Sequence, residues 1–113
     1  MTKQRFHFAA WTWDVDAALQ RVTDDQRPSR MAPVSQLARV VGLMAVDQDH
    51  AATVDLAEPI LLAPLPSSPD VLLPIDGWHR IWRAVTDGVE ELPAVALTPE
   101  EGETFLLTRP GAR

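Results

Sequence analysis

Residues 75–80, Ile-Asp-Gly-Trp-His-Arg, are the part of the sequence whose types and spacing could do chemistry. A helix start offers free N–H groups and the positive end of the helix dipole, so it attracts anions. Arg80 can hold a phosphate or a carboxylate through two parallel hydrogen bonds. Gly77 allows a ligand to approach the main chain closely. The pattern predicts a ligand or phosphate site made by Gly77, Trp78, His79, Arg80 and Arg83.

Three side chains near this turn are the candidate catalytic groups. A carboxylate, either Glu58 or Asp76, could accept the proton of a substrate hydroxyl during phosphoryl transfer. His79 could act as an acid or as a second phosphate ligand, because an unperturbed histidine titrates near neutral pH. A plainer interpretation stays open, in which the basic residues of the helix are solvated or pair with Asp87 and Glu90.

A strand and an amphipathic helix must position these side chains. Residues 71–75 form an apolar run interrupted by Pro74, which predicts a strand at a sheet edge or beside a bulge. Asp76 is expected to cap the helix that follows, and Gly88 to end it. The apolar residues of that helix recur at i, i+3, i+4 and i+7 and predict one buried face: Trp78, Ile81, Trp82 and Val85.

Four segments together resemble the ParB/sulfiredoxin-like superfamily. They are the turn at 75–80, the strand-like Glu-Leu-Pro-Ala-Val-Ala-Leu at 91–97, and the upstream Ala-Pro-Val-Ser-Gln-Leu at 32–37 and Glu-Pro-Ile-Leu-Leu at 58–62. The resemblance implies an α+β fold, in which a short mixed sheet packs with helices. It also implies a nucleotide phosphate held at Gly77, His79 and Arg80.

The branches of this superfamily differ in chemistry, and two of them fit the chain poorly. Sulfiredoxins carry a cysteine where this chain has Trp78, and the absence of any cysteine excludes their reaction. Partition proteins carry a downstream E-N-x-x-R motif that is absent here, while the D-G-x-H-R turn is nearer the kinase-like members.

The resulting functional prediction is a small domain that binds a nucleotide or a phosphorylated ligand at residues 77–80, with a nucleotide-dependent phosphotransferase as its enzymatic form. A nucleotide accompanied by Mg²⁺ is the cofactor that the resemblance implies. The alternative is a non-catalytic accessory or regulatory domain that keeps the fold and binds another protein. The residues leave open whether the chain is an enzyme, and whether it forms a homodimer.

Length and charge narrow the class of protein. The 113 residues, 46% of them hydrophobic, predict one soluble domain. A net charge of −6 argues against a nucleic-acid partner. No apolar run reaches membrane-spanning length and no signal peptide is visible, which predicts a cytoplasmic protein without a membrane partner.

No metal site is predicted, although one acidic cluster has suitable spacing. Oxygen-rich D-x-D spacing suits magnesium or calcium better than zinc, and a solvated loop is the favoured interpretation. The residues of the cluster are Asp47, Asp49, His50 and Asp55.

Residues 1–30 are expected to be a strand–helix extension packed on the same domain as a core at 31–113. Residues 5–13 predict one aromatic strand with a bulge near 9–10. A helix capped by Asp14 follows, with its inner face formed by Val15, Ala18, Leu19 and Val22. Trp11 and Trp13 are expected in the core or at a subunit contact rather than in a carbohydrate site.

The remaining segments have clear local signals. Residues 31–34, 59–63 and 92–97 predict strands, and the proline-serine segment 64–70 predicts a loop. Ser35 is expected to open a helical turn. Thr98 and Glu101 have the spacing of a capping box at the start of a last short helix.

Overall fold

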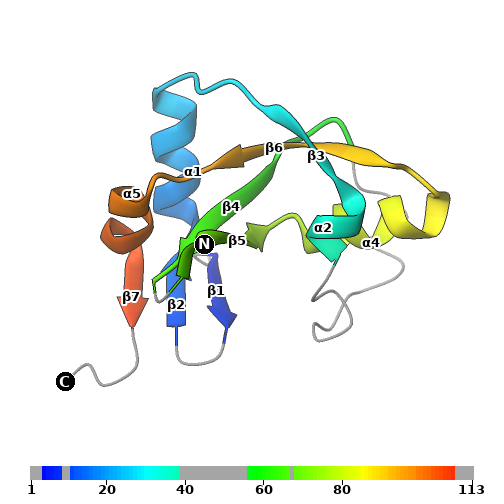
Figure 1. The fold of residues 1–113 in the computed structure, drawn as a ribbon. Helices are drawn as coiled ribbons and strands as arrows, with labels where there is room; N and C mark the ends of the chain where they lie inside the picture. The colour runs from blue at the N-terminus through cyan, green and yellow to red at the C-terminus, as the bar shows by residue number, and fades with distance from the viewer. Residues whose placement is uncertain (1–3, 9–10, 39–55, 67, 109–113) are drawn as a thin grey trace.

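The computed structural model of the chain describes residues 4–8, 11–38, 56–66 and 68–108 (Figure 1). The elements follow in the order β1 Arg5–Phe8, β2 Trp11–Asp14, α1 Val15–Asp24, β3 Arg30–Pro33, α2 Val34–Leu37, β4 Ile60–Leu65, β5 Ser68–Asp76, α4 Trp78–Asp87, β6 Glu91–Ala96, α5 Pro99–Thr104 and β7 Leu106–Thr108. The predicted α+β class is confirmed.

The larger sheet is mixed and has the strand order β3-β6-β4-β5. Strand β6 pairs with β3 antiparallel and with β4 parallel, while β4 and β5 form an antiparallel hairpin. Helix α4 connects β5 to β6 and so returns the chain in the direction of β4. Asp76, the last residue of β5, pairs with Leu61 near the start of β4. The start of α4, which follows Asp76, therefore lies beside the start of β4.

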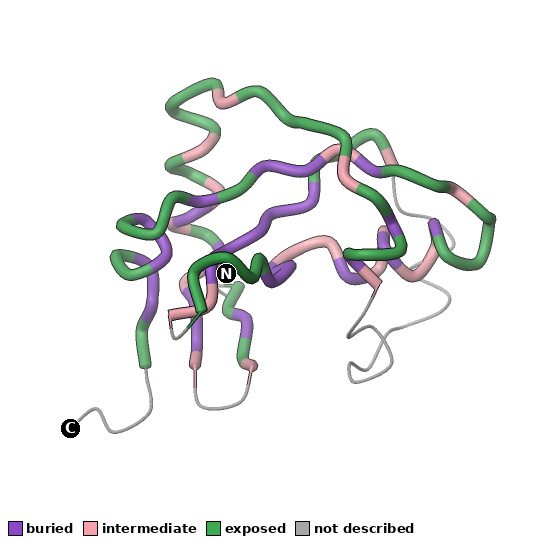
Figure 2. The backbone as a smooth tube through the Cα atoms, in the orientation of Figure 1, coloured by how far each residue is buried: buried purple, intermediate pink, exposed green. Residues whose placement is uncertain are grey.

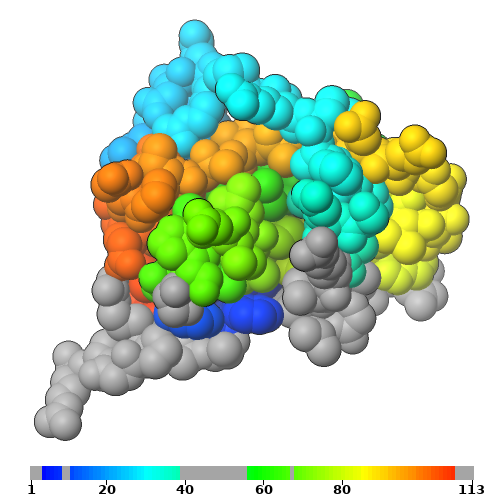
Figure 3. All heavy atoms as spheres, viewed as in Figure 1, coloured from blue at the N-terminus to red at the C-terminus, as the bar shows by residue number. Residues whose placement is uncertain are grey.

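The loop predicted at residues 64–70 is wrong, because β4 and β5 occupy most of it. Pro64 lies inside β4 opposite Leu72, and Leu65 lies opposite Ser68. The ladder shifts register between Pro64 and Leu65, as expected where a residue without an N–H group enters a strand. The β4–β5 hairpin is therefore irregular, and it lies between α5 and α2 on the face shown in Figure 3.

The smaller sheet, β1-β2-β7, joins the two ends of the described chain. The single aromatic strand predicted over 5–13 is wrong: Phe8 pairs with Trp11, so the segment is an antiparallel hairpin. The change in side-chain parity marks a reversal of the chain, and the predicted bulge at 9–10 lies outside the described residues. Strand β2 then pairs with β7, which the sequence pattern did not indicate.

One continuous hydrophobic core joins both sheets and the helices. Buried positions follow β4 and the middle of β6, as the purple segments in Figure 2 show. Helix α4 contributes Trp78, Ile81 and Ala84 to this core. The buried face predicted for this helix is wrong at Val85, which is 50% exposed, and Trp82 is only partly buried. The Trp78 ring stacks on Phe6 with 5.8 Å between ring centroids, which fixes the N-terminal hairpin against α4. Trp13 is fully buried, as predicted for a core residue.

Helix α1 begins as predicted and ends in an unusual way. The Asp14 carboxylate accepts a hydrogen bond from the Ala17 N–H at 3.0 Å. At the other end, the N–H of Gln26 bonds to the Thr23 carbonyl and the N–H of Arg27 to the Val22 carbonyl. This pair of bonds defines a Schellman motif, whose left-handed residue is usually glycine. Here it is Gln26, with φ 48°, at a cost of about 1–2 kcal/mol.

Two further cap predictions have opposite outcomes. The capping box is confirmed, because the Glu101 N–H donates to the Thr98 hydroxyl at 3.1 Å and the Thr98 N–H to Glu101 Oε1 at 2.9 Å. The expected Ser35 cap is wrong, since Pro33 is the N-cap of α2 and no side chain bonds there. The early start at Val34 allows Val34 and Leu37 to enter the core.

Among the helices that the structure describes, none is long and apolar enough to cross a membrane. The cytoplasmic location stays a prediction.

Candidate functional site

Helix α4 begins with a different N-cap from the one that the sequence predicted. Gly77, with φ 100° and ψ 19°, is the N-cap of α4, and it makes no side-chain cap hydrogen bond because glycine has no side chain. Asp76 as N-cap is therefore wrong. The left-handed turn at Gly77 directs the Asp76 carboxylate to the guanidinium of Arg80, whose Nη2 donates to Asp76 Oδ2 at 3.2 Å.

Arg80 lies across the turn and is largely buried, with 11% of its side chain exposed. Its Nη1 also lies 3.6 Å from Glu58 Oε2, and the Glu58 side chain is 73% exposed. A Cβ atom at Gly77 would lie 2.5 Å from Ile60 Cδ1 and 3.0 Å from Arg80 Nη2. The space beside the Gly77 Cα, expected to admit a ligand, is thus filled by the side chains of Ile60 and Arg80.

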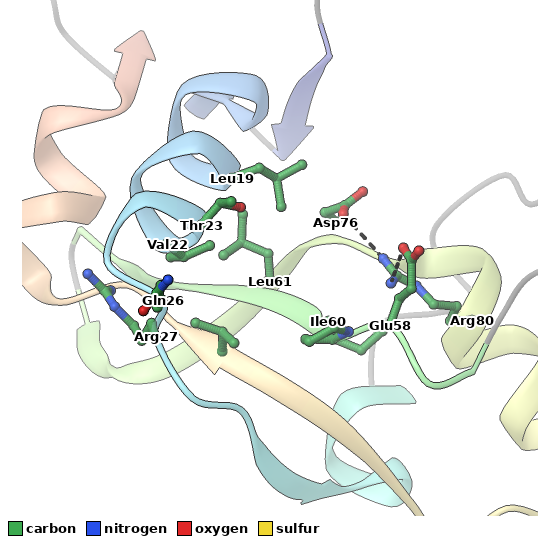
Figure 4. A pocket seen from close by; sticks show the side chains of 12 residues that line it. Leu19, Val22, Thr23, Gln26, Arg27, Glu58, Ile60, Leu61, Asp76 and Arg80 are labelled. Carbon is green, nitrogen blue, oxygen red and sulfur yellow. Dashed lines mark hydrogen bonds and ion pairs between the residues drawn. The ribbon is translucent and has the colours of Figure 1, made fainter.

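A pocket of about 300 Å³ opens on the other side of this guanidinium, between α1 and strands β4 and β6 (Figure 4). It is lined by Leu19, Val22, Thr23, Gln26, Arg27, Glu58, Pro59, Ile60, Leu61, Asp76, Arg80 and Val95. Glu58, Asp76 and Arg80 lie at one end and Gln26 and Arg27 at the other, with aliphatic side chains between them. Its volume is at the lower end of the range for ligand pockets, about 300–1,000 Å³.

Three of the seven predicted site residues line this pocket: Glu58, Asp76 and Arg80. Gly77, Trp78, His79 and Arg83 do not line it. Trp78 is buried in the core, while Arg83 donates to Asp87 at 3.2 Å, as the plainer interpretation expected for the basic residues. The structure therefore gathers the predicted carboxylates around one arginine, on the side of α4 that faces α1.

The wall formed by α1 was missed by sequence reasoning. Thr23, Gln26 and Arg27 come about 30 residues before Glu58, and no short motif links the two segments. Residues 23–30 are polar and include Pro28, a composition that predicts only a loop. In the structure α1 extends to Asp24, and the Schellman motif places Gln26 and Arg27 at the mouth of the pocket.

The two arginines of the pocket differ in how fully they are paired. Arg27 makes a bidentate contact with Glu101, at 2.7 Å for each Nη–Oε pair, and also donates to Asp25 and to the Ala96 carbonyl. Its hydrogen bonds lower the pKa of Glu101 to about 2, assisted by the Thr98 N–H, although burial opposes this shift. The pKa of Arg27 is raised in turn, most strongly by its hydrogen bonds to Glu101 and next by its hydrogen bond to Asp25.

Arg80 keeps unused donors. Among the described residues it donates one hydrogen bond, to Asp76, and its second ion pair, with Glu58, is longer. A guanidinium carries five N–H donors. Of the two cations that line the pocket, Arg80 therefore keeps more unused donors for a further acceptor, since within the described part of the chain Arg27 makes four hydrogen bonds and Arg80 makes one.

The described residues contain no group of three histidine or acidic side chains that could hold a metal ion. The acidic cluster at 47–50 and Asp55 lies outside the described residues. Comparisons of the chain with protein-family models, with curated proteins and with solved structures find no match. The superfamily resemblance stays a prediction.

Proposed function

We propose that this domain binds a small phosphorylated molecule, such as a nucleotide, in the pocket beside Arg80. The observation that carries the proposal is a largely buried guanidinium with unused donors at the end of a 300 Å³ pocket. Phosphate oxygens accept the charge-assisted hydrogen bonds that such a group provides. The aliphatic residues between the two ends offer a surface for the uncharged part of the ligand.

Glu58 is the group that the phosphate would replace. Its ion pair with Arg80 spans 3.6 Å and its side chain is mostly exposed, so the pair contributes about 0–1 kcal/mol. A phosphate held by two N–H groups of Arg80 would form shorter bonds and carry more charge. Asp76 keeps its own contact with Nη2 and holds the guanidinium in place.

The same arrangement supports the phosphotransferase form of the proposal. Glu58 and Asp76 would lie beside the bound phosphate, where a carboxylate can take the proton of an attacking hydroxyl. His79 does not line the pocket, so these two carboxylates are the proposed proton acceptors. A nucleotide would bring Mg²⁺ on its phosphates, and the ion would neutralise charge there.

Arg80→Gln is expected to weaken phosphate-dependent binding by about 10–100-fold, because charge-assisted hydrogen bonds contribute about 1.5–3 kcal/mol. Calorimetry with inorganic phosphate, ATP, CTP and GTP measures the change. Arg5→Gln, on the exposed face of β1, is the matched control and should bind as the wild type does. Wild-type protein that binds none of these compounds, or Arg80→Gln protein that binds them normally, would contradict the proposal.

Glu58→Gln is expected to act in the opposite direction and raise phosphate affinity about two- to five-fold. The substitution keeps the shape of the side chain but removes the charge that competes for Arg80. Titrations of this variant beside Glu91→Gln, an exposed glutamate outside the pocket, isolate the local effect. A loss of affinity in Glu58→Gln would mean that the carboxylate contacts the ligand directly, and would place the phosphate elsewhere.

A non-catalytic protein-interaction domain is the second candidate, and one observation favours it. Strand β5 lies at the edge of the mixed sheet and exposes Val71 and Leu72. Exposed apolar side chains on an edge strand promote pairing with another chain. Sedimentation over a range of concentrations tests the simplest form, a homodimer, which Leu72→Lys should dissociate.

A further inference from the structure

Gln26 combines an unfavourable backbone with a free side chain at the mouth of the pocket. Among the described residues it is the only one other than glycine with a positive φ. Glycine is the usual residue at this position of a Schellman motif, because it has no Cβ atom to crowd the carbonyl. Residues held in such conformations cluster at ligand sites, so the backbone of Gln26 points to a role for its side chain.

The Gln26 carboxamide is available to a ligand. It lines the pocket and makes no hydrogen bond to the described residues. Figure 4 shows it beside Arg27, at the end opposite Glu58 and Arg80. Arg27, at the same end, already makes four hydrogen bonds, to Glu101, Asp25 and the Ala96 carbonyl, so most of its five donors are in use.

The two ends of the pocket therefore differ in chemistry. One end presents a guanidinium with unused donors, and the other presents a neutral group that carries a donor and an acceptor side by side. The aliphatic side chains of Val22, Leu61 and Val95 also line the pocket, and Figure 4 shows Leu61 between the two ends. A planar apolar body with a phosphate at one edge and an amide-like edge at the other would complement all three regions.

We infer that Gln26 is a specificity-determining residue whose carboxamide binds an adjacent donor–acceptor pair on the ligand, as presented by a nucleobase or a carboxamide. This inference rests on the proposed phosphate site at Arg80 and adds the recognition of the other end. Glutamine binds bases through such paired hydrogen bonds when it reads adenine in nucleic acids. The left-handed backbone keeps the side chain at the mouth of the pocket.

The test separates phosphate binding from recognition of the second end. Affinities of the wild type are measured for inorganic phosphate, ribose 5-phosphate, AMP, GMP, CMP, UMP and nicotinamide mononucleotide. The expected result is a preference of at least ten-fold for one base or for the carboxamide over ribose 5-phosphate. In Gln26→Gly this preference should fall at least five-fold, while affinity for inorganic phosphate stays unchanged.

Thermal unfolding checks that the Gln26→Gly variant is folded. Gln26→Gly relieves the left-handed strain, so its melting temperature should equal or exceed that of the wild type. Gln26→Glu keeps the length of the side chain and removes its donor, so the preferred base should change or the preference should disappear. Gln20→Ala replaces a glutamine inside α1 that does not line the pocket, and should keep the wild-type preference.

The outcomes distinguish this inference from the proposed function. Arg80-dependent phosphate binding without any preference among the nucleotides, or a preference that survives in Gln26→Gly and Gln26→Glu, overturns the role of Gln26 alone. The absence of binding by every phosphorylated compound overturns both. A preference for nicotinamide mononucleotide assigns the second end to a carboxamide, and a preference among AMP, GMP, CMP and UMP assigns it to a base.

Discussion

Gly77→Ala is expected to lower the free energy of unfolding by about 3 kcal/mol, the sum of backbone strain and overpacking. The φ of 100° is a conformation that residues with a Cβ atom rarely adopt. The added methyl group would also lie 2.5 Å from Cδ1 of Ile60, a fully buried residue of β4. Ile60 and Arg80 both border the pocket, so their displacement should weaken phosphate binding as well.

Urea unfolding of Gly77→Ala and Gly88→Ala separates the two contributions. Gly88 also has a positive φ, of 74°, but no atom lies within 4 Å of the position of its Cβ. Gly88→Ala should therefore lose only the strain energy, about 1–2 kcal/mol. Equal losses in both variants would show that Ile60 and Arg80 do not pack against Gly77.

Glu101→Gln is expected to lower the free energy of unfolding by about 2–4 kcal/mol at neutral pH. The carboxylate is mostly buried and binds Arg27 through two hydrogen bonds, so its loss leaves Arg27 with a neutral partner in a partly desolvated site. It also receives the Thr98 N–H of the capping box, which glutamine can still accept. Glu100→Gln, a change of an exposed residue in the same turn of α5, is the control, and its free energy of unfolding should stay close to that of the wild type.

The Glu101 contact also predicts a pH dependence. Folding lowers the pKa of Glu101 from 4.5 to about 2, mainly through the hydrogen bonds from Arg27. The contribution of Glu101 is therefore complete above pH 4.5 and disappears as the pH falls towards 2. Stability measured across this interval should fall more steeply in the wild type than in Glu101→Gln. Parallel curves would contradict the assignment of this pKa.

Local signals in the sequence predicted the elements that hold the site. The spacing of Trp78, Ile81 and Val85 predicted α4, and Gly88 marks its end, because both patterns act within a few residues. Asp14 and the Thr98–Glu101 box set helix starts through contacts three residues apart. Prolines misled the prediction at 64–70, since the pairing of β4 with β5 tolerates Pro64 inside a strand.

The sequence predicted the residues at only one end of the pocket, the end beside the start of α4. The turn at 76–80 identified Asp76 and Arg80, and Glu58 followed as a nearby carboxylate. The other wall depends on α1 packing over β4 and on the pair of Arg27 with Glu101, which lie 74 residues apart in the chain. Such contacts arise from the tertiary fold and leave no periodic or spaced signal in a single sequence.

The pairing of β2 with β7 has a consequence for folding. Thr12 and Trp13 meet Thr108 and Leu106, so this ladder closes a loop of more than 90 residues. Closing so long a loop has a large entropic cost, which must be offset before the strands gain their hydrogen bonds. The outer segments of the described chain should therefore form late and cooperatively. In hydrogen exchange, the amides that β2 and β7 share should open together rather than by independent fraying.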